Sequence, residues 1–194
     1  NQEPPKGKNS RVNFRKEKRK NDTHQSTTDP DARLYKKSKG KEAKLCFIGN
    51  TINENRNNFV VETLLNHASG TAEREASLEM VDSIKPPSKK ITLGGDKNYD
   101  VADYTEKLRG KKVTSHTSMN DKNRKSSIDG RTYRHAGYHI SQVKRKRIEE
   151  FFGWGKCIGG LRKFRHKGME LLNGIFKFTA ASYNLIKLTK LVPA

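Results

Sequence analysis

Cysteine is scarce in this chain: Cys46 and Cys157 are the only two among 194 residues, and they lie far apart. This spacing excludes a disulfide framework and a Cys-x-x-Cys zinc knuckle, and it predicts a reducing compartment. Long apolar runs are missing as well. The N-terminus is too polar for a signal peptide, and Asn173, Lys177 and Lys187 interrupt the most apolar stretch, so we expect no membrane span.

Apolar side chains are few overall. Hydrophobic residues make up 31% of the chain and charged residues 32%, which is a low ratio for a densely packed domain. Residues 1–31 show no apolar periodicity and include Pro4-Pro5 and a basic run, which predicts a flexible basic arm. The folded domain is therefore expected over 32–194.

Acidic residues are outnumbered and unevenly distributed. Lys and Arg total 41 against 21 Asp and Glu, for a formal net charge of +20. Residues 45–104 hold 6 basic and 9 acidic side chains, whereas residues 105–194 hold 21 and 6. A cationic surface gains free energy by releasing counterions from a polyanion, so nucleic acid is the predicted partner. Carboxylates gathered in one third favour a nuclease-like protein, which needs acids for metal ions, over a basic coat protein.

Apolar patterning predicts a mixed α/β order of elements. Two adjacent antiparallel strands are expected over 44–48 and 59–65, joined by polar residues 50–58, and a helix over 71–84 is expected next. A short strand over 91–95 then delivers Asp96 at its carboxyl end, and a helix over 101–108 and a strand near Val113 follow. Because a strand end holds a side chain rigidly, Asp96 is a candidate functional residue.

The C-terminal third is expected to form a polar loop over 117–134, a helix over 141–156 and a last helix over 169–191. His135 and His139 have helical metal-ligand spacing, but no suitably spaced third ligand follows, and zinc is not expected. The helix residues expected to be buried are Ala76, Met80, Val81, Ile84, Ile148, Phe151, Phe152, Leu172, Ile175, Phe176, Tyr183 and Ile186.

One face of the 141–156 helix combines basic, amide and acidic groups. At about 100° per residue, Gln142, Arg145, Glu149 and Lys156 fall within roughly 60° of one another. The run 144–147 beside them is entirely basic. This arrangement is expected where phosphate groups must approach an acid that holds a metal ion.

Each of these residues also has an ordinary interpretation. Asp96 can be a turn-forming acid after a strand, and Glu149 can be the i,i+4 ion-pair partner of Arg145 on a solvated helix. The cations can simply keep the surface soluble. Trp154 and the aromatic residues of the last helix are expected to pack in the core rather than to bind a partner.

The order of several motifs favours the functional interpretation. Residues 141–154 (SQVKRKRIEEFFGW), with the spacing Arg145-x3-Glu149-x6-Lys156, resemble the glutamate signature of bacterial insertion-sequence transposases of the DDE class. Four other stretches resemble the same family and occur in the family's order: 29–34 (DPDARL), 70–75 (GTAERE), 93–100 (LGGDKNYD) and 160–166 (GLRKFRH).

This resemblance implies an α/β, ribonuclease H-like domain in which a mixed sheet is flanked by helices and three acids hold two Mg²⁺ ions. The family cuts transposon DNA ends and joins them to target DNA. Asp96 matches the second aspartate and Glu149 the glutamate, so both are candidate catalytic and metal-binding residues. The implied partners are double-stranded DNA and a second copy of the protein. The implied location is the bacterial cytoplasm with its nucleoid. The implied DNA-binding residues are Lys144, Arg145, Arg147, Lys156, Arg162, Lys163 and Arg165.

Two departures from the family pattern limit what is implied. The family often has tyrosine where this chain has Gln142, which removes a stacking or phenolic group. The first aspartate, expected in an upstream Asp-Gly-Thr/Ser strand, has no counterpart: the Asp-Gly pair at 129–130 lies too late, and Asp29 and Asp31 lie in a turn-like, proline-containing segment. We therefore expect the C-terminal portion of a transposase, without its first core strand and with little or no activity alone.

Two other functions stay open at this point. One is a non-catalytic protein that uses the basic surface to bind transposon ends or to associate with a full-length transposase. The other is a basic RNA-binding protein of ribosomal type, in which Asp96 and Glu149 have no special role.

Overall fold

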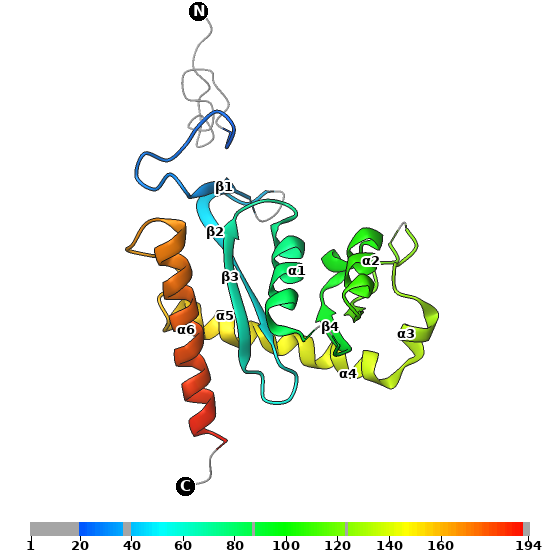
Figure 1. The fold of residues 1–194 in the computed structure, drawn as a ribbon. Helices are drawn as coiled ribbons and strands as arrows, with labels where there is room; N and C mark the ends of the chain where they lie inside the picture. Colours follow the sequence, from blue (N-terminus) through cyan, green and yellow to red (C-terminus); the bar gives the residue numbers. More distant parts are fainter. Residues whose placement is uncertain (1–19, 37–39, 87, 123, 192–194) are drawn as a thin grey trace, which may run out of the picture.

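The computed structural model describes residues 20–36, 40–86, 88–122 and 124–191, so most of the expected flexible arm lies outside the described residues. In the described part, a three-stranded antiparallel sheet and a two-stranded parallel sheet are flanked by helices (Figure 1). The predicted mixed α/β architecture is confirmed at this level. None of the described helices has the length and apolar character needed to cross a membrane.

The antiparallel sheet consists of β1 (Arg33–Tyr35), β2 (Lys44–Asn53) and β3 (Val60–His67), with β2 in the middle. The two predicted strands are confirmed, but β2 continues through residues 50–53, which were expected to be a linker. The amide of Asn50 explains this, because it donates to Leu64 O at 3.3 Å and to Asn66 Oδ1 at 3.1 Å across the sheet. A polar side chain is thus satisfied inside the strand pair.

The parallel sheet consists of β4 (Ile91–Gly95) and β5 (Val113–Thr117), both predicted, and Gly95 lies opposite Thr117. Helix α1 (Ala72–Ile84) packs against β2 and β3, and α2 (Ala102–Gly110) packs against β5. No hydrogen-bonded pairing joins β2 to β4 in the described part of the chain. Instead the two sheets share one core.

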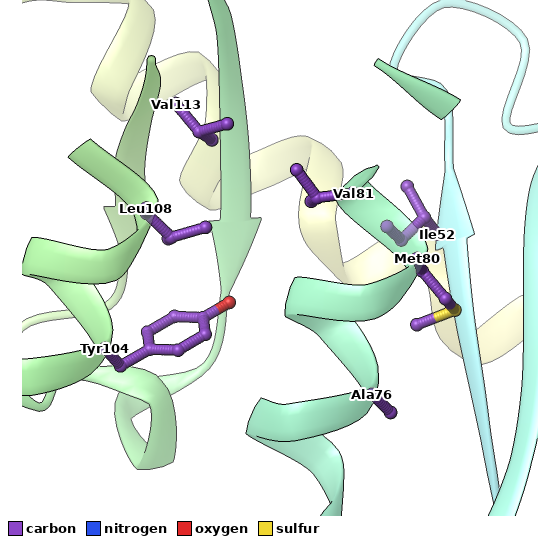
Figure 2. Packing of buried hydrophobic residues seen from close by; sticks show 7 residues of the cluster. All are labelled: Ile52, Ala76, Met80, Val81, Tyr104, Leu108 and Val113. Carbon is purple, nitrogen blue, oxygen red and sulfur yellow. The ribbon is translucent and has the colours of Figure 1, made fainter. Parts of the chain in front are cut away.

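This shared core is built around α1. Figure 2 shows Val81 of α1 between two groups of buried side chains. Ile52 and Met80 lie on the side of the antiparallel sheet, and residues of α2 and β5 lie on the other. The core residues predicted on α1 are buried there, except that Ile84 is only partly buried at its edge. The members from α2 and β5 are Tyr104, Leu108 and Val113.

A second group of helical segments follows β5 in the chain. These are α3 (Gly130–Arg134), α4 (Ala136–Lys144), the 3-10 turn η3 (Arg145–Arg147), α5 (Ile148–Cys157) and α6 (Met169–Thr189). The single helix expected over 141–156 therefore begins earlier, at Ala136, and is interrupted by η3. His135 sets this beginning, because its Nδ1 accepts a hydrogen bond from Gly137 N at 3.0 Å.

A second core joins α5 and α6 to β3. Phe151 is fully buried there and Phe176 is 2% exposed. A side chain at Gly49 would lie 2.9 Å from the Phe176 ring, which explains why β2 has glycine at this close approach. Leu172 and Tyr183 are buried as predicted, and Ile175, Phe152 and Trp154 pack around the cluster. Ile186 was expected to be buried and is 42% exposed, so that prediction is wrong.

Two asparagines of α6 bind the outer edge of β3. Asn184 Oδ1 accepts from Val60 N at 2.9 Å, its Nδ2 donates to Val60 O at 2.7 Å, and Asn173 Oδ1 accepts from Leu65 N at 3.1 Å. These bonds satisfy backbone groups that an edge strand otherwise leaves open. They also fix which side of α6 faces the sheet.

Candidate functional site

Asp96 lies directly after β4 and is exposed. Its Oδ1 accepts a hydrogen bond from Asn98 N at 2.8 Å, which caps the 3-10 turn η2 (Lys97–Tyr99). The turn-forming interpretation of this acid is thus confirmed. Because the bond engages one carboxylate oxygen, it orients the side chain without precluding a ligand at the other oxygen.

The strand that ends at Asp96 packs against α4. A side chain at Gly94 would lie 3.5 Å from Arg145 Cβ and 3.9 Å from Ser141 Cβ. The strand therefore places residue 94 against α4, while the Asp96 side chain, just after the strand, turns to Asn98 of η2.

Two hydrogen bonds show the direction in which α4 crosses this sheet. Tyr138 Oη donates to Thr117 O at 3.0 Å, and Gln142 Nε2 donates to His116 O at 2.7 Å. The helix thus runs opposite to the strands. Asp96 lies toward the N-terminal end of α4. Glu149 lies one turn beyond Arg145, past the C-terminal end of the same helix. The two acids flank the contact between Gly94 and α4 instead of meeting at it.

Glu149 is exposed and unpaired. Among the described residues, none forms a hydrogen bond or ion pair with its carboxylate. The i,i+4 ion pair with Arg145 is not formed, because Arg145 Nε donates to Gln142 Oε1 at 3.0 Å instead. Gln142, bound at its other end to β5, therefore positions the Arg145 guanidinium. An acid inside a basic segment is left available.

The neighbouring Glu150 has the opposite role. It accepts hydrogen bonds from Lys187 Nζ at 3.1 Å and from Asn58 Nδ2 at 3.2 Å, and Arg147 Nε lies 3.7 Å away. Burial would raise the pKa of Glu150, but the Lys187 contact and the other donors outweigh it and lower the pKa. Glu150 thus joins α5 to α6 and to the β2–β3 turn.

Most of the predicted DNA-binding cations are not neutralised by other described residues. Arg147 is the exception, since it pairs with Glu150 and also donates to Arg56 O at 3.1 Å. The other six form no ion pair with any carboxylate of the described residues. Because their charge is uncompensated, the surface from α4 to the start of α6 retains a positive potential. The exposed members of this set are Lys156, Arg162, Lys163 and Arg165.

Asp100 has a structural role that the motif alone did not reveal. It is 1% exposed and accepts hydrogen bonds from Asn120 N at 2.7 Å, from Ser127 N at 2.8 Å and from Ser127 Oγ. Burial would raise the pKa of Asp100, but the hydrogen bonds from Ser127 and Asn120 outweigh it and lower the pKa. The carboxylate thus fastens the 118–129 loop beside the Asp96 turn.

Asp100→Asn is expected to lower the free energy of unfolding by about 2 kcal/mol at neutral pH, because one carboxylate oxygen is replaced by a donor that faces donors. Because the pKa of Asp100 is lower in the folded state, its carboxylate stabilises the fold at pH values above the unfolded pKa. This stabilisation is lost as the pH falls through the folded pKa. The difference from wild type should therefore shrink at acidic pH. Urea unfolding at neutral and at acidic pH measures the difference in the free energy of unfolding. Asp103→Asn, on the exposed side of α2, is the control.

Carboxylate oxygens are ligands that Mg²⁺ prefers, so the donor type of Asp96 and Glu149 fits the implied ion. Within the described residues, however, no group of three or more His, Cys, Asp or Glu side chains is placed to hold a metal ion. Cys46 and Cys157 are free thiols. The two acids thus suit a divalent ion by donor type, while the described residues assemble no site of three such ligands.

Comparisons with models of protein families, with curated proteins and with solved structures found no match to this chain.

Proposed function

We propose that this chain is the C-terminal part of a DDE transposase, with a ribonuclease H-like fold, whose intact form cuts and joins transposon DNA. The observation that carries the proposal is the free carboxylate of Glu149. It lies in a basic segment, on the helical layer that packs against the strand ending at Asp96. The order of the motifs along the chain supports the same conclusion.

Glu149 lies among cations and yet forms no ion pair with a described residue. Surface ion pairs contribute only about 0.2–1 kcal/mol to stability, so weak pairing by itself is unremarkable. Still, the nearest cation on the helix, Arg145, is held away by Gln142. A carboxylate kept free beside uncompensated cations suits a metal ion that is approached by phosphates.

In this proposal Asp96 and Glu149 are two of the three acids that hold divalent metal in the intact protein; among the described residues they flank the contact of Gly94 with α4 and form no common site. Mg²⁺ bound there would activate the attacking oxygen and stabilise the leaving oxygen of a phosphoryl transfer. The other residues of the chain bind and orient DNA. Arg145, fixed by Gln142, and the exposed Lys156 contact phosphates, and the 162–165 cluster extends the surface.

The division of the sheet agrees with this proposal. An additional core strand that paired with β2 and β4 would join the two sheets beside α1 and would supply the family's first aspartate. The α4–α5 segment already crosses from one sheet to the other, since Asn58 Nδ2 after β2 donates to Arg147 O at 2.8 Å. Without that strand we expect little or no catalysis by this chain.

The incomplete set of acids also favours a second candidate function for the chain by itself. A protein that keeps the basic surface and has two of three acids can occupy transposon ends, or associate with a full-length transposase, without cutting DNA. Both candidates require binding of duplex DNA through the same cations.

Binding of duplex DNA tests both candidates. We expect Arg145→Gln with Lys156→Gln to reduce the slope of log affinity against log salt concentration by about 2, one for each lost phosphate contact. Fluorescence anisotropy over about 50–200 mM salt measures the slope. Lys107→Gln is the control, because Lys107 lies on α2 and pairs with Asp103 at 2.8 Å. An unchanged slope, or equally tight binding of structured RNA, would contradict the proposal.

A further inference from the structure

Helix α6 has two opposite apolar faces. One face packs in the second core through Leu172, Phe176 and Tyr183. The other face is open to solvent: Leu171 is 53% exposed, Phe178 75% and Leu185 64%. Large apolar side chains on an exposed surface are unremarkable singly, but a continuous row of them marks an interaction site.

The exposed residues follow a heptad pattern. Leu171, Phe178 and Leu185 are spaced by seven residues, and each is followed three positions later by another small or apolar residue. At about 100° per residue these six positions cover an arc of roughly 100°, centred opposite the core face. We call this arc the α6 seam; it consists of Leu171, Gly174, Phe178, Ala181, Leu185 and Leu188.

We infer that the α6 seam binds the α6 seam of a second copy of this chain. A spacing of seven with alternating steps of three and four is the pattern of helices that pair along their length, in which side chains of one helix fill the spaces of the other. The small residues Gly174 and Ala181 allow a close approach of the two helices. Because both helices have the same spacing, a second copy matches the seam along its full length.

The surface area and the charges agree with a homodimer. The exposed seam offers roughly 500 Å² of apolar surface per copy, against about 800 Å² per partner in a standard interface, so the seam can form the centre of one. Charged residues make up 32% of the chain, yet the seam has none. Among the positions that border it, Glu170 and Lys177 are charged. In a parallel pair they would face Ile175 and Ser182 of the second copy, so the pair brings no like charges together.

A lipid surface is a less suitable partner for this face. Helices that lie on membranes carry many cations beside their apolar face and are free of other packing. Only Lys177 borders the seam as a cation, and the opposite side of α6 is packed in the core. The inference does not depend on the proposed function.

Sedimentation of the 194-residue chain over a range of concentrations tests the inference. We expect a dimer, and we expect Phe178→Glu and Leu185→Glu each to raise its Kd at least about 100-fold, because a charge would be buried in the seam. Ile158→Glu is the matched control, since Ile158 is 72% exposed at the end of α5 and lies outside the seam. Thermal unfolding checks that each variant is folded.

Cross-linking gives an independent readout. In a Cys46→Ser, Cys157→Ser background, Ala181→Cys is expected to form a disulfide-linked dimer on mild oxidation, because this residue lies within two residues of the centre of the seam and is therefore close to its copy in a parallel or an antiparallel pair. A monomer at all concentrations, or a dimer that Phe178→Glu leaves intact, would overturn the inference. So would a monomer that binds phosphatidylcholine or phosphatidylserine vesicles through Phe178 and Leu185.

Discussion

Phe151→Ala is expected to lower the free energy of unfolding by about 4 kcal/mol, a large part of the total for a single domain. Phe151 has no exposed surface, and its ring centroid lies 5.3 Å from Phe152, 5.9 Å from Phe176 and 5.4 Å from Tyr183. It lies where α5 and α6 meet the antiparallel sheet. Urea unfolding followed by circular dichroism measures the loss.

Phe151→Leu is the matched control, because it keeps most of the volume and should cost less than about 1.5 kcal/mol. Phe151→Ala should also affect the candidate site. Phe151 is two residues from Glu149, so loss of its packing should also free α5 and weaken DNA binding. Wild-type stability of Phe151→Ala would contradict the packing described for α5 and α6.

Glu149→Gln and Glu150→Gln are expected to have opposite consequences. Glu149 has no partner in the described residues, so its replacement should leave stability unchanged and reduce the affinity for Mn²⁺, a probe for Mg²⁺, at least about tenfold. Glu150 holds Lys187 and Asn58, so its replacement should cost about 1 kcal/mol and leave Mn²⁺ binding unchanged. Mn²⁺ titration followed by electron paramagnetic resonance, together with urea unfolding, measures both quantities.

The pH dependence separates the two glutamates further. The pKa of Glu150 is lowered in the folded state, so its stabilisation is present above the unfolded pKa and is lost as the pH falls through the folded value. The stability of wild type and Glu150→Gln should therefore converge at acidic pH. If Glu149→Gln were the destabilising change and Glu150→Gln the one that removed Mn²⁺, the assignment of roles would be reversed.

The elements predicted correctly are those with a clear apolar period. Helices α1 and α6 and strand β3 bury regular rows of side chains, and this is visible in the sequence. The weaker signals for β4 and β5 came from short stretches around Ile91 and Val113. The missed elements depend on contacts distant in sequence. Strand β1 is three residues long and is held partly by Asn21, whose Oδ1 accepts from Leu34 N at 2.7 Å. No periodicity reveals such a bond.

The candidate site was predictable as a set of residues but not as a geometry. The alignment of Gln142, Arg145, Glu149 and Lys156 assumed a regular helix, whereas η3 changes the rotation per residue between Arg145 and Arg147. The partner of Arg145 could not be deduced either. Spacing alone favours Glu149, and the bond to Gln142 depends on how β5 holds the glutamine.

A double-mutant cycle of Mn²⁺ affinity with Asp96→Asn and Glu149→Gln tests the central claim, that these two acids, which flank the contact of Gly94 with α4 in the structure, serve one divalent-metal site. If metal draws both carboxylates into one site, each single change should remove most of the binding and the double variant should lose little more, which gives a clear coupling energy. Glu106→Gln, an exposed glutamate on α2, is the control. Losses that simply add, or single variants that bind Mn²⁺ like wild type, would contradict the account.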